Sequence, residues 1–314
     1  MRGFTAALTI LGVSILVFAA IHLVPGRYED ILLGPFASEQ LRAAVAERFG
    51  LDRSLPEQYV RWLAAALTGD LGTSLTTRQP VLAEFIRRAP VTAQLAVMAG
   101  AFTLLIGLPL GILSAVGASR RGVRAGSRLI GALGLSLPDF VLGSLLVYLF
   151  SRYHLGLSVG GYVPFGQDPV QNLRAMLLPS LTLSVFGIAL LVRTSRDAVL
   201  GVLTEPYITA AVARGERPFD IVRHHVLRNA AIPIVTVLAT YVAYLLGGAV
   251  IVEKLFTLPG FGIYVLTAVG NRDYAIVQAG VLVAAVVFVL VNMLADVAYA
   301  AIDPRIASGR ALVR

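Results

Sequence analysis

Few residues in this sequence have types and spacings that could do chemistry. Asp139 is a lone acidic residue inside an apolar stretch, His224 and His225 are adjacent, and Lys254, the only lysine, follows Glu253. A phosphate-binding P-loop requires Gly-Lys-Ser/Thr, and a zinc-binding H-E-x-x-H helix places its histidines one turn apart. Neither pattern occurs, and a G-x-S-x-G elbow is also missing. The residues therefore predict no catalytic centre, metal site or bound cofactor. Energy for any uphill process would come from an ion gradient or from a partner ATPase.

Asp139 is the one acidic residue that the sequence places deep inside an apolar stretch. It lies ten residues beyond Leu129, which is roughly 15 Å at 1.5 Å per helical residue. One interpretation is a carboxylate that faces a transmembrane pathway and meets a cationic group of the cargo. The other is a polar residue that packs at a Pro138 kink, bonded to backbone or kept protonated by burial. The sequence leaves both open.

Composition places the chain in the membrane. Hydrophobic residues make up 57% and charged residues 14%, whereas soluble domains carry about 25% charge. The mean hydropathy is +0.80, and the chain has no cysteine for a disulfide or a thiolate site. A net charge of +8 would suggest nucleic acid for a soluble protein, but these arginines fall between apolar stretches. They indicate membrane topology and no nucleic-acid partner.

Six apolar stretches are long enough to cross a bilayer, for which a helix needs about 20 residues. They predict an all-α polytopic membrane protein with six transmembrane helices. The first stretch is too long for the core of a signal peptide and lacks a small-x-small cleavage site, so we expect it to be retained. The stretches comprise residues 3–24, 89–119, 129–151, 175–192, 229–252 and 274–295.

Arginine distribution predicts the orientation, because short cytoplasmic loops are enriched in basic residues. Arg2, the 120–128 loop, the 193–228 loop and the tail are richer in arginine than the loops on the other side. We therefore expect both termini to be cytoplasmic. Three segments follow: an N-terminal transmembrane helix (1–24), an extracytoplasmic helical cap (25–88), and a permease core (89–314) of five helices with a cytoplasmic loop at 193–233.

The predicted cap contains two short helices. Ser38 can cap a helix that carries Leu41, Val45 and Phe49 on one face and stops at Gly50. Pro56 can open a second helix that ends near Gly69. This second helix carries Tyr59, Trp62, Leu63 and Leu67. The cap is therefore expected to be ordered and not a linker.

The segment 205–233, EPYITAAVARGERPFDIVRHHVLRNAAIP, is too long for a simple turn. Its pattern predicts a helix, a break at Gly215 and a second helix that Pro218 can begin. The first helix carries Tyr207, Ala210, Ala211 and Arg214 at helical spacing. The second places Phe219, Val222 and Val226 on one side, with Arg217, Arg223 and Arg228 around it. Small residues on such a helix pair allow close approach by a partner, or by the chain's own bundle.

This segment resembles the EAA loop of ABC-importer permeases, in which Ala-Ala, three residues and Gly fall on Ala210, Ala211 and Gly215. Thr209 stands where that loop generally has glutamate. The ending at His225, Leu227 and Arg228 is similar to that of the dipeptide, oligopeptide and nickel branch. Further similar motifs run along the chain: LVPG at 23–26, RFGLDRSLPEQYVRWL at 48–63, GDLGTS at 69–74, GGAVIVEKLFTLPGFG at 247–262, RDYAIVQ at 272–278 and VNMLADVAYAAIDPR at 291–305.

The resemblance implies a subunit in a bacterial cytoplasmic (inner) membrane that pairs with a second permease, two ATPase domains and an extracytoplasmic solute-binding protein. ATP and Mg²⁺ would bind the partner subunits and no cofactor would bind this chain. The loop around Gly215 would be the coupling helix seated in the ATPase. The residues that carry this implied role are Glu205, Tyr207, Ala210, Ala211, Arg214, Gly215, Arg223 and Arg228. Glu253, Pro259, Gly260 and Gly262 would face the binding protein.

The cargo expected from the resemblance is short peptides, with nickel, glutathione and haem as alternatives within the same class. Two departures from the family pattern, Arg27-Tyr28 after Pro25-Gly26 and Asp139 in place of a small or hydroxyl residue, leave the cargo open. A second hypothesis is a gradient-driven carrier that acts alone and uses Asp139. A membrane enzyme ranks last, because no convergent nucleophile, base or ligand set can be assembled.

Overall fold

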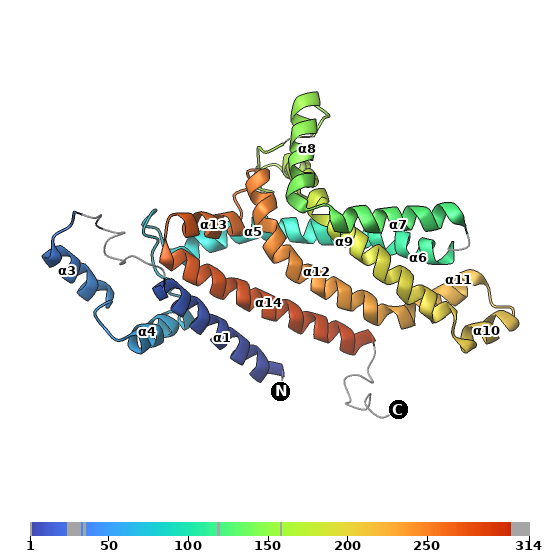
Figure 1. The fold of residues 1–314 in the computed structure, drawn as a ribbon, viewed down its shortest axis with the longest axis horizontal. Coiled ribbons are helices and arrows are strands. Elements are labelled where there is room, and N and C mark those ends of the chain that lie inside the picture. The colour runs from blue at the N-terminus through green and yellow to red at the C-terminus, as the bar shows by residue number, and fades with distance from the viewer. Residues whose placement is uncertain (1, 24–32, 34–35, 118–119, 158, 303–314) are drawn as a thin grey trace. The chain divides into compact units, whose positions relative to one another are not determined.

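The computed structural model describes residues 2–302 apart from 24–32, 34–35, 118–119 and 158. The described part is nearly all helical (Figure 1). Pro25, Gly26, Arg27 and Tyr28, on which part of the family pattern rests, lie outside the described residues, as does the end of the 291–305 motif. The elements are α1 (Arg2–Leu23), α3 (Glu39–Phe49), α4 (Leu55–Leu67), α5 (Val81–Phe102), η1 (Thr103–Gly107), α6 (Leu108–Val116), α7 (Arg121–Ser136), α8 (Asp139–Tyr153), α9 (Pro169–Leu203), α10 (Pro206–Ala213), α11 (Pro218–Asp220), η2 (Ile221–Val226), α12 (Leu227–Leu255), α13 (Phe261–Gly270) and α14 (Tyr274–Ile302).

Within the described residues, five continuous helical stretches are long and apolar enough to cross a membrane, and two of them join several of these elements. The number rises to six if the bent pair α7 and α8 forms a single span. The all-α, multi-span prediction is therefore confirmed. The third expected span, 129–151, is not one straight helix. Helices α7 and α8 meet at 97°, and Leu137 between them has an extended backbone (ψ 114°). Pro138 explains the break, because a proline disfavours helical geometry in the residue before it.

The chain forms two compact units, which we describe separately. The first comprises the chain up to Pro90 together with Gly260–Val289, and the second comprises Val91–Pro259 together with the chain from Leu290. We predicted a 1–24 transmembrane helix, a 25–88 extracytoplasmic cap and an 89–314 permease core. That division depends on which segments lie on which side of the membrane, and it stays a prediction.

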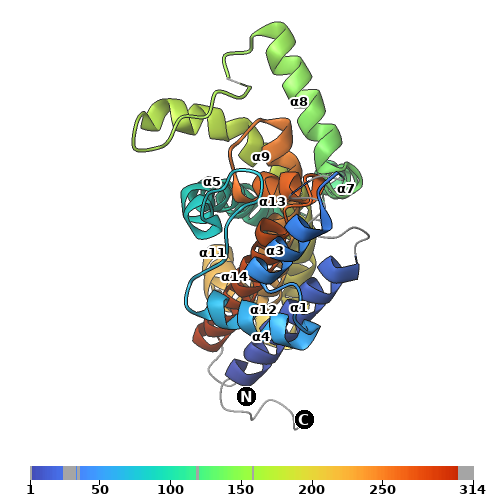
Figure 2. The same cartoon turned by 90° about the vertical axis from the view of Figure 1, so that its left-hand side faces the viewer.

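In the second unit, α9 packs against η1, α6, α7 and α12 (Figure 1, Figure 2). Its middle is buried, with Met176, Leu183 and Leu191 fully inside. Gly107 and Gly111 lie against α9, where a methyl group at Gly107 would come 3.2 Å from the Leu191 Cβ. Small residues let two helix backbones approach this closely, so Gly107 and Gly111 permit the close contact with α9.

In the first unit, α1 packs against α4. The Phe18 ring lies 5.4 Å from the Tyr59 ring and 6.2 Å from the Trp62 ring, and Ser14 Oγ is 2.8 Å from Tyr59 Oη. The two expected cap helices are confirmed as α3 and α4. The Ser38 side chain accepts a hydrogen bond from the Leu41 N–H, Gly50 ends α3 at φ 67°, and proline stands in the first turn of α4.

Helix α13 was not predicted, because it lies between the apolar stretches 229–252 and 274–295 and belongs to neither. It packs into an apolar core of the first unit that includes Val81, Phe85 and Tyr264. Phe85 meets Phe261 and Tyr264 edge to face, with ring centroids 4.8 and 6.0 Å apart. At ten residues α13 is too short to be read as a span, and it lacks a side-chain N-cap, so sequence signals for it were weak.

Candidate functional site

The 205–233 segment has the predicted helix, glycine break and second helix. Helix α10 ends in a turn in which Gly215 N–H donates to Val212 O (2.9 Å) and Glu216 N–H donates to Ala211 O (3.2 Å). Gly215 adopts φ 77°, a left-handed conformation that glycine reaches without strain. Pro218 stands in the first turn of α11, where its missing N–H costs no hydrogen bond. Local backbone chemistry thus explains the shape of the loop.

Burial divides the residues predicted to couple to an ATPase. Ala211 is fully buried and packs with Ile208, Ile221 and Val226, so it holds α10 to the chain's own bundle. Ala211 is therefore not exposed on the surface of this loop, and its part in coupling stays a prediction. The other members of the predicted set are exposed: Glu205, Tyr207, Ala210, Arg214, Gly215, Arg223 and Arg228.

Two apolar side chains that the sequence analysis did not place on this surface are also exposed. Val212 is 60% exposed and Phe219 is 71% exposed, beside Tyr207 at 41%. Phe219 was expected on the same side as Val226, which is buried. The π-helical turn η2 begins two residues after Phe219 and ends at Val226, and such a turn shifts the helical register. The sequence contains no clear signal for that turn, so the wrong face was assigned to Phe219.

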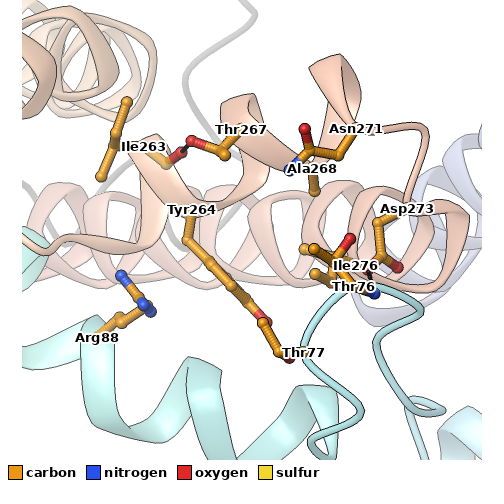
Figure 3. Close-up of a pocket in the computed structure, with 10 residues that line it drawn as sticks. All are labelled: Thr76, Thr77, Arg88, Ile263, Tyr264, Thr267, Ala268, Asn271, Asp273 and Ile276. Carbon is orange, nitrogen blue, oxygen red and sulfur yellow. Dashed lines mark hydrogen bonds between the residues drawn. The ribbon is translucent and has the colours of Figure 1, made fainter.

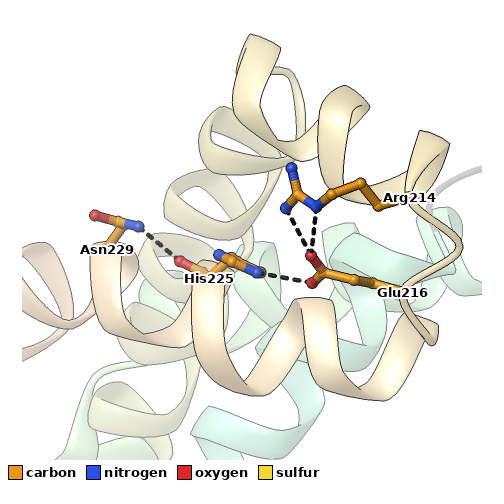
Figure 4. Close-up of polar contacts among 4 residues, drawn as sticks. All are labelled: Arg214, Glu216, His225 and Asn229. Carbon is orange, nitrogen blue, oxygen red and sulfur yellow. Dashed lines mark hydrogen bonds and ion pairs between the residues drawn. The ribbon is translucent and has the colours of Figure 1, made fainter.

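A polar network closes the loop (Figure 4). Arg214 donates from Nη2 (2.6 Å) and Nε (3.2 Å) to Glu216 Oε1, and His225 Nε2 lies 2.9 Å from Glu216 Oε2. Asn229 Nδ2 donates to the His225 carbonyl (2.7 Å) and to Tyr207 Oη (3.1 Å). The hydrogen bond from Arg214, and next that from His225, hold the pKa of Glu216 below its usual value. Glu216 and His225 were missed as positioning residues; the short spacing between Arg214 and Glu216 was the available signal.

Asp139 begins α8 directly after the break at Pro138, and it is buried, with 7% of its surface exposed. Its Oδ2 accepts a hydrogen bond from Tyr244 Oη (2.6 Å), and the Tyr244 ring stacks on Phe186 with centroids 4.3 Å apart. A methyl group at Gly248 would come 3.3 Å from the same oxygen. The partner of Asp139 is therefore a side chain of α12 and not the backbone. This geometry matches a packed polar residue at a helix break, and a role in a pathway stays a prediction.

We expect Tyr244→Phe to lower the stability of the chain by about 1–3 kcal/mol, since a buried acceptor loses its donor. The measurement is the thermal unfolding midpoint in detergent, followed by size-exclusion chromatography. Tyr148→Phe is the matched control, because Tyr148 is a 60% exposed tyrosine of α8. Equal midpoints for the two variants would contradict a structural role for the Asp139–Tyr244 bond.

The four residues expected to face a binding protein are not alike in exposure. Glu253 is fully buried, and its Oε1 accepts a hydrogen bond from Thr92 Oγ1. Its backbone carbonyl accepts from Leu258 N–H (2.8 Å). The Glu253 carboxylate thus lies inside the unit, and a role toward a binding protein stays a prediction. Pro259 is exposed, whereas Gly260 and Gly262 are buried.

Among the described residues, no group of three or more metal-binding side chains is arranged to hold a metal ion. The spanning helices and the exposed 205–233 loop define a multi-pass helical membrane protein with an exposed helix–glycine–helix loop.

Two family models match the chain. Residues 107–308 match the model described as "Binding-protein-dependent transport system inner membrane component", and residues 1–96 match the model of the N-terminal part of such membrane components. The chain therefore belongs to the family of inner-membrane components of binding-protein-dependent transport systems. It is a multi-pass inner-membrane permease of the peptide-type ABC importers.

Relatives match over nearly the full length. A probable peptide ABC transporter permease of Sinorhizobium fredii is 38% identical over 94% of this chain and 94% of its own length. The glutathione transport system permease GsiC is 38% identical in Salmonella typhimurium and 37% identical in Escherichia coli K12, in each case over 95% of this chain and 94% of the relative.

Solved structures of the MetNI methionine ABC transporter, in an inward-facing conformation, share the fold. One superposes with a TM-score of 0.57 at 21% identity and covers 69% of this chain and 95% of the matched chain. A second gives 0.54 at 23% identity. At this identity the likeness is evidence for the fold alone.

Proposed function

We propose that this chain forms, with a second permease, the pathway by which short peptides enter the cytoplasm. Two ATPase domains on partner subunits supply the energy, and an extracytoplasmic binding protein delivers the cargo. The names of the relatives support a peptide cargo, and glutathione, the cargo of the GsiC system, is itself a tripeptide. Nickel and haem become alternatives only if no peptide is moved.

The observation that carries this proposal is the exposed 205–233 loop. It presents apolar side chains at Tyr207, Val212 and Phe219 together with exposed arginines. An exposed apolar patch rimmed by charge is typical of a protein-binding surface. The Gly215 turn and the Glu216 network give this surface a fixed shape. Nucleotide-driven movement of a docked ATPase would then pull on α10 and rearrange the spanning helices as rigid bodies.

The proposed topology places both termini and the 205–233 loop in the cytoplasm, and the 25–88 cap outside. The arginine distribution in the short loops supports it. Accessibility of single cysteines is a direct test, because the chain has none of its own. A cysteine at Thr209 should react with an impermeant thiol reagent only after the membrane is opened, and one at Gln58 should react in intact cells with a permeable outer membrane. The reverse pattern would overturn the topology.

Function is tested with the tagged chain expressed together with a second permease, the ATPase subunits and the binding protein of the same system. We expect these subunits to co-purify and ATP-dependent uptake of labelled dipeptide or glutathione in proteoliposomes. An uptake that needs no ATP, follows an ion gradient and disappears in Asp139→Asn would overturn the proposal in favour of a gradient-driven carrier.

Glu216 gives a prediction about pH. Its pKa in the folded loop lies below the ordinary value of 4.5, so its stabilising contribution is present above that value and is lost as the pH falls through the lowered pKa. Coupled ATPase activity of Glu216→Gln should therefore be lower than wild type by a ratio that stays constant between about pH 6 and 8. The assay is binding-protein-stimulated ATP hydrolysis.

The matched control for this prediction is Asp197→Asn. Asp197 lies near the end of α9, is 60% exposed and pairs with Arg196 at 3.4 Å, so we expect little change from its loss. If the ratio for Glu216→Gln instead rises to one within the neutral range, a group other than the Glu216 carboxylate controls the loop.

A further inference from the structure

The first unit contains a cavity of about 270 Å³ that has no part in the function proposed above. This is far more than the roughly 15 Å³ that one water needs. The turn at 76–77, α5, α13 and the start of α14 surround it (Figure 3). Its lining combines polar and apolar side chains, and all of these residues belong to the first unit.

Asp273 forms one end of the cavity. It is fully buried, and its Oδ2 accepts hydrogen bonds from Ser74 Oγ (2.7 Å) and Thr76 N–H (3.1 Å). Its Oδ1 is also buried and has no hydrogen-bond partner among the described residues. A buried carboxylate oxygen without a partner is costly. The cavity beside it provides room for a group that donates to Oδ1.

Arg88 forms the other end. Its guanidinium carbon lies 4.4 Å from the centre of the Tyr264 ring, and its Nε donates to Glu84 Oε2 (3.1 Å). Within the part of the chain that the structure describes, Glu84 is the one residue that accepts a hydrogen bond from Arg88. A guanidinium has five N–H donors in a planar fork, so its terminal nitrogens keep donors for a carboxylate ligand. Figure 3 shows Arg88 and Asp273 on opposite sides of the Tyr264 side chain.

The rest of the lining adds no charged side chain, and Tyr264 lies between the two charged residues (Figure 3). Ile263, Ala268 and Ile276 are apolar, and the Thr267 hydroxyl donates to the carbonyl of Ile263 in its own helix (2.7 Å). A cavity with a carboxylate at one end, a guanidinium at the other and apolar walls is complementary to a short zwitterion. A dipeptide with free ends has this form.

We propose that the first unit holds a binding site for a free short peptide, whose ammonium group donates to Asp273 Oδ1 and whose carboxylate accepts from Arg88. The inference rests on the peptide cargo of the proposed function, and deepens it by placing a cargo site on the permease itself. The 76–77 turn and α13 come from segments that the proposed topology places outside the membrane. The site would therefore hold peptide on the extracytoplasmic side.

The test uses the full chain in lipid nanodiscs, without binding protein or ATPase, and equilibrium dialysis against labelled L-alanyl-L-alanine. We expect saturable retention by the wild type, and retention at least about tenfold weaker in Asp273→Asn and in Thr267→Phe. Asparagine still offers Ser74 and Thr76 an acceptor, and phenylalanine at Thr267 fills the cavity without replacing a charged residue. A normal size-exclusion profile confirms that each variant is folded.

Thr236→Phe is the matched control, because Thr236 is also an exposed helical threonine whose hydroxyl donates to the carbonyl four residues earlier (2.8 Å). Its retention should equal that of the wild type. N-acetyl-alanyl-alanine lacks the ammonium group and alanyl-alaninamide lacks the carboxylate, so both should bind weakly. No saturable retention by the wild type, or equal retention of the blocked peptides, would overturn the proposal.

A third ligand distinguishes a site for a free peptide from a site for a lysine side chain of a partner protein. Nα-acetyl-lysinamide offers an ammonium group alone, and competition as strong as that of the dipeptide would overturn the zwitterion site in favour of a lysine from a partner protein. ATP-driven uptake of the same dipeptide by the complete transporter is measured in parallel. Uptake without retention by the isolated chain overturns only the cavity site, whereas retention without uptake overturns only the proposed function.

Discussion

Replacing Gly215 by tryptophan should abolish ATP-coupled uptake while leaving membrane insertion intact. Gly215 is exposed and adopts φ 77°, and no heavy atom lies within 4 Å of a methyl group built on it. The cost of a side chain here is therefore conformational, about 1–2 kcal/mol for an L-residue held in the left-handed region. Tryptophan adds bulk on the surface that we propose docks into the ATPase. Coupled ATPase activity should fall at least about tenfold.

A series of side chains separates strain from bulk at this position. Asparagine tolerates the left-handed region, so Gly215→Asn should keep most of the activity, whereas Gly215→Ala should lose some through strain. Gly201→Trp is the control, because Gly201 is also exposed with no atom within 4 Å, but its φ is not positive. Normal uptake by Gly215→Trp would refute the coupling role of this loop.

Leucine at Gly187 should severely destabilise the second unit. A methyl group at this position would come 2.6 Å from Thr103 Oγ1 and overlap the ring of Tyr241. Tyr241 is almost fully buried and donates a hydrogen bond to Leu183 O (3.0 Å). Overpacking typically costs about 1–3 kcal/mol, and loss of the tyrosine bond adds about 1 kcal/mol. We expect a loss of roughly 3 kcal/mol, measured as the thermal unfolding midpoint in detergent.

Gly131→Leu on α7 is the control for this effect, because no heavy atom lies within 4 Å of its built methyl group. Its unfolding midpoint should stay near that of the wild type. The double variant Gly187→Leu/Tyr241→Ala should be less destabilised than the sum of its single variants, since removing the ring makes room for leucine. Additive losses would mean that the clash with Tyr241 is not the cause.

Much of the architecture follows from sequence because it depends on local chemistry. The apolar stretches predict spanning helices, since a backbone inside a bilayer must satisfy its own hydrogen bonds. Ser38, Gly50, Gly215 and Pro218 mark helix ends through capping and backbone geometry alone. The spacing of Ala210, Ala211 and Gly215 indicated the family, which the comparisons confirm.

Other features could not be predicted, because they depend on contacts between residues far apart in the sequence. The break between α7 and α8 has a local cause in Pro138, but no local pattern predicts its 97° angle. The π-helical turn η2 places Phe219 outside and Val226 inside, contrary to the simple helical pattern, and the expected docking residue Ala211 is buried. Helix α13 was missed because its ten residues are stabilised by distant contacts, in which Phe261 and Tyr264 of α13 pack against Phe85 of α5.

The sequence by itself thus determined the class of protein, the all-α multi-span fold and the position of the helix–glycine–helix loop, because hydropathy and turn chemistry act over a few residues. Only the tertiary structure decided which side chains of that loop are exposed, that Asp139 bonds to Tyr244, and that Arg88 and Asp273 line one cavity. The members of each pair are more than a hundred residues apart in the chain. The burial of a side chain and the residue that it contacts depend on how such distant segments pack together, and no local sequence pattern predicts that packing.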